Sequence, residues 1–315
     1  MPDVVLQTDA LTKRYGSLIA VDRLSLQIHE GEVFGFLGPN GAGKTTSINM
    51  MCGLLKPDSG TVMIHGHPLN SWGKEIRRRV GICPQSLVLW PKLTCLEQIL
   101  FVGELYGMTP RVARKQAETL LQELDLSEKK NVLGHKLSGG MQRRLNLALA
   151  LVHDPQIVVL DEPEAGLDPQ SRIKVREYIH SLARKKTVIL TTHNMDEADR
   201  LADRVAVIDH GQLLVLDTPQ ALKQQVGQGD VIEIALNNSP QDQQRLKEDL
   251  SLVGPAMQVS IAGDVLVVRA LNAVNLLPGI LAVLTAAQIQ PGEVRLRQNT
   301  LEDVFLQLTG RRLRE

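Results

Sequence analysis

The sequence predicts an α/β fold with a parallel sheet, followed by a small α+β unit, and three observations indicate this. A glycine-rich segment, residues 38–46, stands between a strand-like apolar run and a helix-like run. A second apolar run ends in two acids, Asp161 and Glu162. Beyond a break in composition at 227–229, strand-like and helix-like segments alternate. The 315 residues are enough for two domains, which we expect at 1–226 and 230–315.

The composition indicates no nucleic-acid partner. The chain has 35 Lys and Arg residues against 35 Asp and Glu residues, so net charge favours neither nucleic acid nor an anionic membrane. Aromatic residues make up only 3% of the chain, too few for base-stacking platforms. The best candidate for a membrane span, 274–287, is interrupted by Asn275, Pro278 and Gly279. Any work at a membrane would therefore use a partner's span.

The glycine-rich segment fits the phosphate-binding pattern G-x-x-x-x-G-K-[ST]. Residues 33–37 before it are apolar like a buried strand, and 45–53 after it are typical of a helix. Glycines let the backbone wrap a phosphate chain with its N–H groups inward, and the helix adds its positive end. We expect Lys44 to reach the β- and γ-phosphates and Thr45 to ligate Mg²⁺; the alternative is a chance match in a turn. The expected nucleotide-binding residues here are Gly38, Pro39, Asn40, Gly41, Ala42, Gly43, Lys44, Thr45 and Thr46.

The two acids follow an apolar run, 157–160, that is typical of a central parallel strand. Carboxylates at the C-terminal end of such a strand emerge where ligands bind in an open α/β sheet. Asp161 is placed to hold Mg²⁺ through water, and Glu162 to orient or deprotonate an attacking water. The alternative is a solvated acidic loop.

Residues 137–142 open an amphipathic helix that we expect to run through Val152. Ser138 is a candidate N-cap, and two glycines, Gly139 and Gly140, follow it. A bare helix N-terminus can bind an anion, although an ordinary capped helix is the better interpretation of this segment taken alone.

These motifs together resemble the ATP-binding-cassette (ABC) family over about residues 4–220. Leu137-Ser138-Gly139-Gly140 is similar to the signature motif of that family. Four further motifs occur in the order that is usual for the family. Tyr15 resembles the aromatic residue that stacks on adenine, and Gln85 resembles the Q-loop glutamine. Residues 165–168, with Asp168, resemble the D-loop, and His193 resembles the switch histidine. Two departures are Met141, where Gln is commonest, and Glu164-Ala165, where small hydroxyl residues are frequent.

The resemblance implies an ATPase that uses ATP and Mg²⁺ as a head-to-tail homodimer. Glu162, His193, Lys44 and Gln85 would be catalytic, and Thr45, Gln85 and Asp161 would hold the metal. Ser138, Gly139 and Gly140 of a second copy would close over the γ-phosphate, and Asp168 would couple the two sites. Gln85 would also link the site to a membrane partner.

A helical subdomain is expected at about 86–152. Thr94 and Glu97 form a capping-box pattern at the start of one helix, and 113–124 is a second periodic stretch. Family analogy places this subdomain against a membrane subunit. The apolar loop 86–90 suits a partner contact, the alternative being a buried core loop.

The last part of the chain predicts a ferredoxin-like β-α-β-β-α-β unit. Strands are expected at 231–236, 257–261, 265–268 and 294–297, and helices at 272–287 and from Ser239-Pro240 through Leu250. A final helix begins at Thr300, capped with Asp303. We expect an accessory or regulatory domain, although the final helix could simply pack on its own domain.

The ending, residues 301–311, resembles the daunorubicin-resistance type of drug-export ATPase. That resemblance implies a separate ABC-2 type permease as partner and a peripheral location at the cytoplasmic face of the inner membrane. The leading hypothesis is an exporter ATPase for a drug-like, lipid-like or other substrate. The alternatives are a soluble ABC ATPase acting in translation or DNA maintenance, and an importer ATPase.

Overall fold

The computed structural model describes residues 3–69, 78–183, 185–226, 229–238, 242–254, 258–271 and 273–310. They divide into two compact units, one before and one after the Pro219–Gln220 bond. Gly227 and Gln228, in the expected linker, lie outside the described residues.

The first unit is built on a six-stranded sheet. Its strands are β3 (Val33–Leu37), β6 (Val80–Cys83), β7 (Ile157–Asp161), β8 (Thr187–Thr192), β9 (Arg204–Asp209) and β10 (Gln212–Asp217), in the order β10-β9-β3-β8-β7-β6. All neighbours pair in parallel except β10, which is antiparallel to β9. The parallel strands are covered on both faces, so nearly all residues of β3, β7 and β8 are buried. The parallel sheet predicted from the sequence is confirmed.

A separate antiparallel sheet, which the sequence analysis did not predict, is formed by the first strands of the chain. It contains β1 (Val4–Tyr15), β2 (Leu18–His29), β4 (Ser59–Ile64) and β5 (His67–Pro68), in the order β2-β1-β4-β5. Alternating burial along β2 shows that one face is covered and the other is exposed.

The helices of the first unit are α1 (Lys44–Met51), α3 (Cys95–Leu105), α4 (Pro110–Glu123), α5 (Gly139–Leu151), α6 (Pro169–Ala183) and α7 (Met195–Leu201), with 3₁₀ turns η2 (Ser127–Lys129) and η3 (Gly134–Lys136). The capping box at Thr94 and Glu97 and the N-cap at Ser138 are present as predicted. The helix predicted at 45–53 instead ends at Met51, because Gly53 has a positive φ of 71°.

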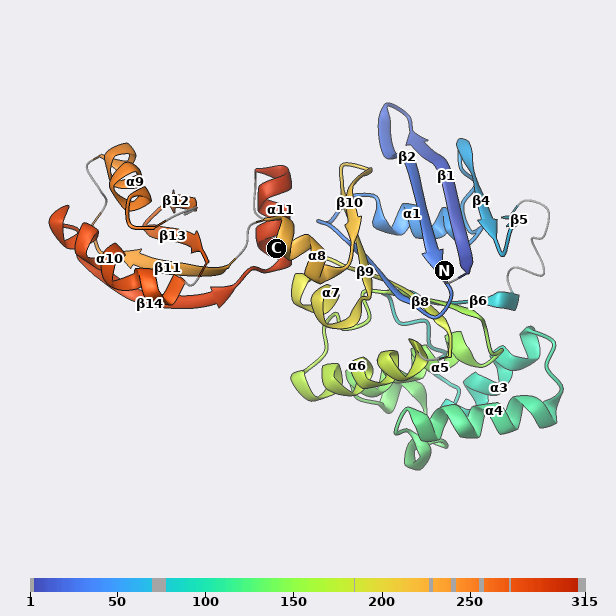
Figure 1. Cartoon of the computed structure of the whole chain (residues 1–315). Helices are drawn as coiled ribbons and strands as arrows, with labels where there is room; N and C mark the ends of the chain where they lie inside the picture. The colour runs from blue at the N-terminus through green and yellow to red at the C-terminus, as the bar shows by residue number, and fades with distance from the viewer. Residues whose placement is uncertain are drawn as a thin grey trace. The chain divides into compact units, whose positions relative to one another are not determined.

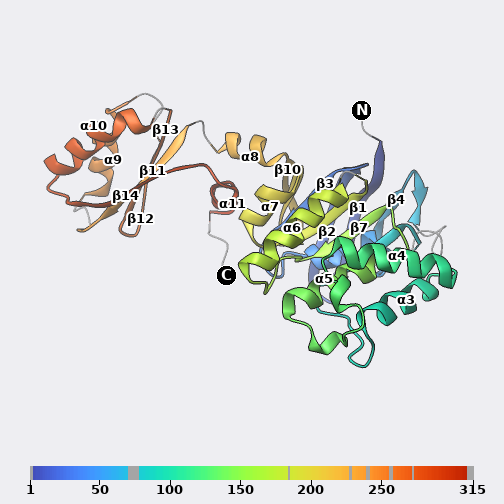
Figure 2. The same ribbon diagram turned by 90° about the horizontal axis from the view of Figure 1, so that it is seen from below.

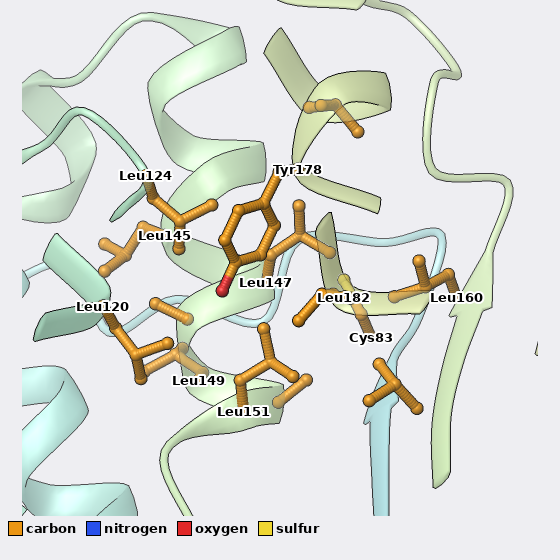
Figure 3. Packing of buried hydrophobic residues seen from close by; sticks show 14 of the residues in the cluster. Cys83, Leu120, Leu124, Leu145, Leu147, Leu149, Leu151, Leu160, Tyr178 and Leu182 are labelled. Carbon is orange, nitrogen blue, oxygen red and sulfur yellow. The ribbon is translucent and has the colours of Figure 1, made fainter. Parts of the chain in front are cut away.

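Each face of the parallel sheet has its own core. On β7, Val158 and Leu160 face the helices α4, α5 and α6, whose leucines surround the ring of Tyr178 (Figure 3). The alternate residues Ile157 and Val159 belong to a second core that includes α1 and the antiparallel sheet. Figure 1 shows α1 beside β1 and β2, and α3 to α6 on the opposite side of β6 and β8.

The second unit contains one four-stranded antiparallel sheet. Its elements are α8 (Pro219–Gln225), β11 (Asp230–Leu236), α9 (Gln243–Ser251), β12 (Gln258–Ala262), β13 (Val265–Ala270), α10 (Ala273–Ala286), β14 (Pro291–Gln298) and α11 (Leu301–Thr309). The strand order β12-β13-β11-β14, with β11 central, is the order that a ferredoxin-like β-α-β-β-α-β unit produces. Helices α9 and α10 pack on one face of this sheet (Figure 2).

Two helix starts in this unit were predicted from local signals. Thr300 and Asp303 form a capping box at α11 as expected. Ser239 and Pro240, the predicted opening of the preceding helix, lie outside the described residues. The helix that the structure describes, α9, begins at Gln243, where the Asp242 side chain accepts a hydrogen bond from the N–H of Arg245.

Candidate functional site

The candidate site lies at the carboxyl ends of four neighbouring parallel strands. The phosphate-loop pattern follows β3, Gln85 follows β6, Asp161 and Glu162 end and follow β7, and His193 follows β8. In the sheet these strands are adjacent in the order β3-β8-β7-β6. Because ligands of open α/β sheets bind outside this edge, the sheet order collects side chains from distant parts of the chain.

The backbone of the loop requires glycine at two positions for different reasons. Gly43 has φ +97°, and a Cβ there would lie 2.3 Å from the carbonyl oxygen of Ala20. A Cβ on Gly38 would lie 2.2 Å from the carbonyl oxygen of Ile208. The loop is therefore held against β2 and β9 at distances that no larger residue permits, just before α1 begins.

Lys44 is the first residue of α1, and it is only 6% exposed. Its ammonium Nζ donates hydrogen bonds to the carbonyl oxygens of Gly38, at 2.7 Å, and Pro39, at 3.0 Å. Burial lowers the pKa of Lys44, while the negative charges of Glu162 and Asp161 oppose that shift. The loop thus holds a cation whose charge interacts with two carboxylates of the same pocket.

The Glu162 side chain contacts two other predicted residues of the site. Its Oε2 accepts a hydrogen bond from Nε2 of Gln85 at 2.8 Å, and its Oε1 lies 2.7 Å from Nδ1 of His193. The residue is 7% exposed and has φ +47°, a backbone conformation that costs a non-glycine residue roughly 1–2 kcal/mol. Its N–H donates to the carbonyl oxygen of Thr191 at 3.0 Å, which helps to hold that conformation.

Asp161 is oriented by the neighbouring strand. The hydroxyl of Thr191, on β8, donates a hydrogen bond to Asp161 Oδ1. Asp161 also lines the pocket described next. Sequence analysis did not single out Thr191, because only the pairing of β7 with β8 places the two side chains together.

A pocket of about 380 Å³ joins these groups. The predicted residues that line it are Tyr15, Asn40, Gly41, Gly43, Lys44, Thr45, Thr46, Gln85, Asp161 and Glu162. The lining residues that sequence analysis missed are Leu18, Ile19, Ala20 and His210. The first three follow Tyr15 closely in the chain, at the start of β2, where Leu18 and Ile19 are exposed.

The oxygen groups in this pocket fit a magnesium ion. The hydroxyl of Thr45, the amide of Gln85 and the carboxylate of Asp161 line the same cavity. Mg²⁺ prefers one or two protein oxygens and keeps waters or phosphate oxygens in its remaining positions. Within the described ranges no cluster of three or more His, Cys, Asp or Glu side chains forms a metal site.

The remaining predicted residues lie elsewhere on the unit. Ser138 caps α5, its hydroxyl oxygen accepting a hydrogen bond from the N–H of Met141 at 3.3 Å. Asp168 accepts two hydrogen bonds from Ser171 at the start of α6, which lower the pKa of its carboxyl. A Cβ on Gly140 would lie 3.7 Å from Asp168 Oδ2, so the two motifs are neighbours. The predicted residues that are not among the described residues lining the pocket are Gly38, Pro39, Ala42, Ser138, Gly139, Gly140, Asp168 and His193.

A phosphate loop before an α-helix, with carboxylates at the end of another parallel strand of the same sheet, defines a nucleotide-binding α/β protein. Residues 21–165 match the ABC transporter family. A Nod factor export ATP-binding protein I from Sinorhizobium fredii is 40% identical over 99% of this chain and 88% of that protein. The daunorubicin resistance ATP-binding protein DrrA3 from Streptomyces coeruleorubidus is 37% identical, covering 100% of this chain and 99% of that one. The linearmycin resistance ATP-binding protein LnrL from Bacillus subtilis is 34% identical, covering 99% of this chain and 100% of that one.

Solved structures agree with these relatives. The cbiO1 protein of Clostridium perfringens, part of the ABC transporter complex cbiONQ, aligns with a TM-score of 0.66 and 27% identity. The alignment covers 71% of this chain and 92% of that one. The chain therefore belongs to the ABC transporter family, as one of its ATP-binding proteins.

Proposed function

We propose that this protein is the ATP-hydrolysing subunit of an ABC-2 type exporter, acting through a separate membrane permease. The names of its relatives support export, since they describe Nod factor export, daunorubicin resistance and linearmycin resistance. No helix in the described part of the chain is long and apolar enough to cross a membrane. On the basis of the relatives' names, we also propose a peripheral position at the cytoplasmic face of the inner membrane, held there by the permease.

The observation that carries the proposal is the carboxylate of Glu162 between Gln85 and His193. In hydrolysis a water oxygen forms a bond to the γ-phosphorus of ATP while the bond from that phosphorus to the β–γ bridging oxygen breaks. The proton that the water loses passes to the Glu162 carboxylate, which lines the pocket beside Lys44 and Thr45. Gln85 and His193 hold that carboxylate in place.

The loop and its neighbours would hold the nucleotide and its metal. Lys44, which donates to loop carbonyls 2.7 and 3.0 Å away, would turn its ammonium to the β- and γ-phosphates. Tyr15, half exposed at the pocket, would stack on adenine. Thr45, Gln85 and Asp161 would bind Mg²⁺, which supplies neutralisation of phosphate charge. Backbone N–H groups of the loop would donate hydrogen bonds to the remaining phosphate oxygens.

A second copy of the chain would complete the site. Ser138 and Gly139 are exposed at the N-terminus of α5 and do not line the pocket of their own chain within the described residues. Together with Gly140 they would approach the γ-phosphate of the partner copy, where the helix end favours an anion. Asp168, beside Gly140, would couple the two sites.

A groove next to the site supports a permease contact. About 680 Å³ of space adjoins Gln85, lined by Ser86, Val88 and Trp90 from the loop before α3 and by Leu149 and Ala150 from α5. Leu87 and Val88 are 43% and 49% exposed, which is unusual for apolar side chains beside a polar site. A short cytoplasmic helix of the permease would bind this groove.

Affinity purification from membranes tests the proposal. The tagged chain is expected to bring down a multi-span membrane protein, and the reconstituted pair to hydrolyse ATP faster than the chain alone. Recovery of ribosomes or DNA in place of a membrane protein would overturn export in favour of the soluble alternative. Absence of ATP hydrolysis in both preparations would overturn the proposed chemistry.

A further inference from the structure

Arg143, on α5, has an unusual set of hydrogen-bond partners. The side chain is 3% exposed, and every partner it has among the described residues is a backbone carbonyl. Nε donates to the carbonyl of Pro163 at 3.2 Å. Nη1 donates to the carbonyls of Pro84 at 2.7 Å and Gln85 at 3.0 Å. Nη2 donates to the carbonyls of Asp161 at 2.7 Å and Glu162 at 2.8 Å. A guanidinium has five N–H donors, so all of its capacity is used.

These carbonyls belong to the two segments that carry the catalytic site. Pro84 and Gln85 follow β6, and Asp161, Glu162 and Pro163 lie at the end of β7 and just beyond it. The same two segments are joined a second time by the side-chain bond from Gln85 to Glu162. Arg143 therefore fixes the backbone from which both of these side chains emerge.

Arg143 also supports the strained conformation of Glu162. The N–H of Glu162 is held by Thr191 and its carbonyl oxygen by Arg143, so both sides of this left-handed residue are anchored. A backbone conformation of this kind persists only where surrounding contacts determine it. Loss of the guanidinium would let the Glu162 carboxylate move without removing any group that lines the nucleotide pocket.

We propose that Arg143 is a positioning residue for hydrolysis, which sets Gln85 and Glu162 relative to each other and to the helix that begins after Ser138. The inference rests on the proposed ATPase function and adds a residue to it. It implies that α5 and the two site segments move as one body. Arg143 thus acts on the chemical step and leaves nucleotide binding to the phosphate loop.

The neighbouring residue supplies a matched control. Arg144 is on the same helix and is similarly buried, at 6% exposed, and its Nη1 also donates to carbonyl oxygens. Those carbonyls belong to Leu124 and Asp125, after α4 and away from the pocket. Substitution of either arginine by lysine keeps the charge and replaces a five-donor fork by a three-donor ammonium.

The experiment compares Arg143→Lys, Arg143→Gln and Arg144→Lys in the full-length chain. Phosphate release gives kcat and KM, a fluorescent ATP analogue gives the Kd, and thermal melting sets a temperature at which every variant is folded. We expect Arg143→Lys to lower kcat about tenfold or more, with KM and Kd within about threefold of the parent protein. Arg144→Lys is expected to lower the melting temperature while kcat per folded molecule stays near the parent value.

A double-variant measurement separates positioning from general damage. If Arg143 acts through Gln85, then Arg143→Lys combined with Gln85→Ala will lower kcat by less than the product of the two single effects. Multiplicative effects, an unchanged kcat in the Arg143 variants, or an equal loss in Arg144→Lys would each overturn the inference. A parent protein that does not hydrolyse ATP would overturn the proposed function instead, so the two failures are distinguishable.

Discussion

The Nδ1 atom of His193 lies 2.7 Å from Oε1 of Glu162, which joins the residue after β8 to the residue after β7. His193 is exposed, whereas Glu162 is buried. The exposed imidazole therefore lies between solvent and the buried carboxylate.

Substitution Glu162→Gln should abolish hydrolysis, because an amide has the size of the carboxylate but cannot take the proton from water. We expect kcat, measured by phosphate release, to fall by about 10²-fold or more. ATP should then hold the dimer together for longer, which size-exclusion chromatography with ATP will detect. The control is Glu177→Gln, an exposed acid on α6. Normal hydrolysis by the Glu162 variant would show that another group is the base.

Substitution Ser138→Arg should block closure of the proposed dimer by placing bulk and positive charge at the N-terminus of α5. Isolated protomers should still bind ATP, since Ser138 does not line the pocket of its own chain among the described residues. We expect ATPase activity and ATP-dependent dimerisation to be lost together. Ser127→Arg, at an exposed serine that begins η2, is the matched control. Unchanged ATPase activity in Ser138→Arg would contradict a site shared between two copies.

Glu164 stands where the family pattern has a small hydroxyl residue, and the structure supplies its partner. Arg176, on α6, donates from Nε to Oε1 at 2.9 Å and from Nη2 to Oε2 at 2.7 Å. Because Glu164 is 7% exposed, Arg176→Met leaves a buried carboxylate unpaired. We expect the free energy of unfolding, measured in urea, to fall by about 2 kcal/mol, less than for a fully buried pair because Arg176 is partly exposed. The double variant Glu164→Gln with Arg176→Met should regain most of the lost free energy of unfolding. If it regains none, the loss in Arg176→Met does not come from the ion pair between Glu164 and Arg176.

Glu197, on α7, should make stability depend on pH. Burial raises its pKa from 4.5 to about 7, reinforced by the negative charges of Glu164 and Glu162, while a hydrogen bond from Thr192 opposes the shift. The folded protein therefore holds this proton more tightly than the unfolded chain does.

The sign of the effect follows from that difference. Protonated Glu197 contributes about 3 kcal/mol to the free energy of unfolding. This contribution is present in full below pH 4.5 and is lost as the pH rises toward 7. Unfolding in urea at several pH values between 4.5 and 8, compared with Glu197→Gln, measures it. The variant should show a flatter dependence over this range; identical curves for the two proteins would contradict a raised pKa.

Much of the local structure was predictable, because it depends on residues close together in the chain. The phosphate loop stands between β3 and α1, and the caps at Thr94, Ser138 and Thr300 form as their spacing predicts. The alternation of strands and helices after Asp230 likewise indicated the topology of the second unit. Two features were harder to predict: the antiparallel sheet of β1, β2, β4 and β5, and the start of α9 at Gln243.

The sequence by itself determined which groups are present: a loop with the phosphate-binding pattern, acids after an apolar strand, and an amide and an imidazole at separate motifs. Local rules suffice for this, since turns, caps and strand faces are set by neighbouring residues. Only the tertiary structure decided that Gln85 and His193 meet at Glu162, and that Arg143 binds five carbonyls behind them. The strands that carry these groups are far apart in the chain, and their order in the sheet follows from how their apolar faces are buried together.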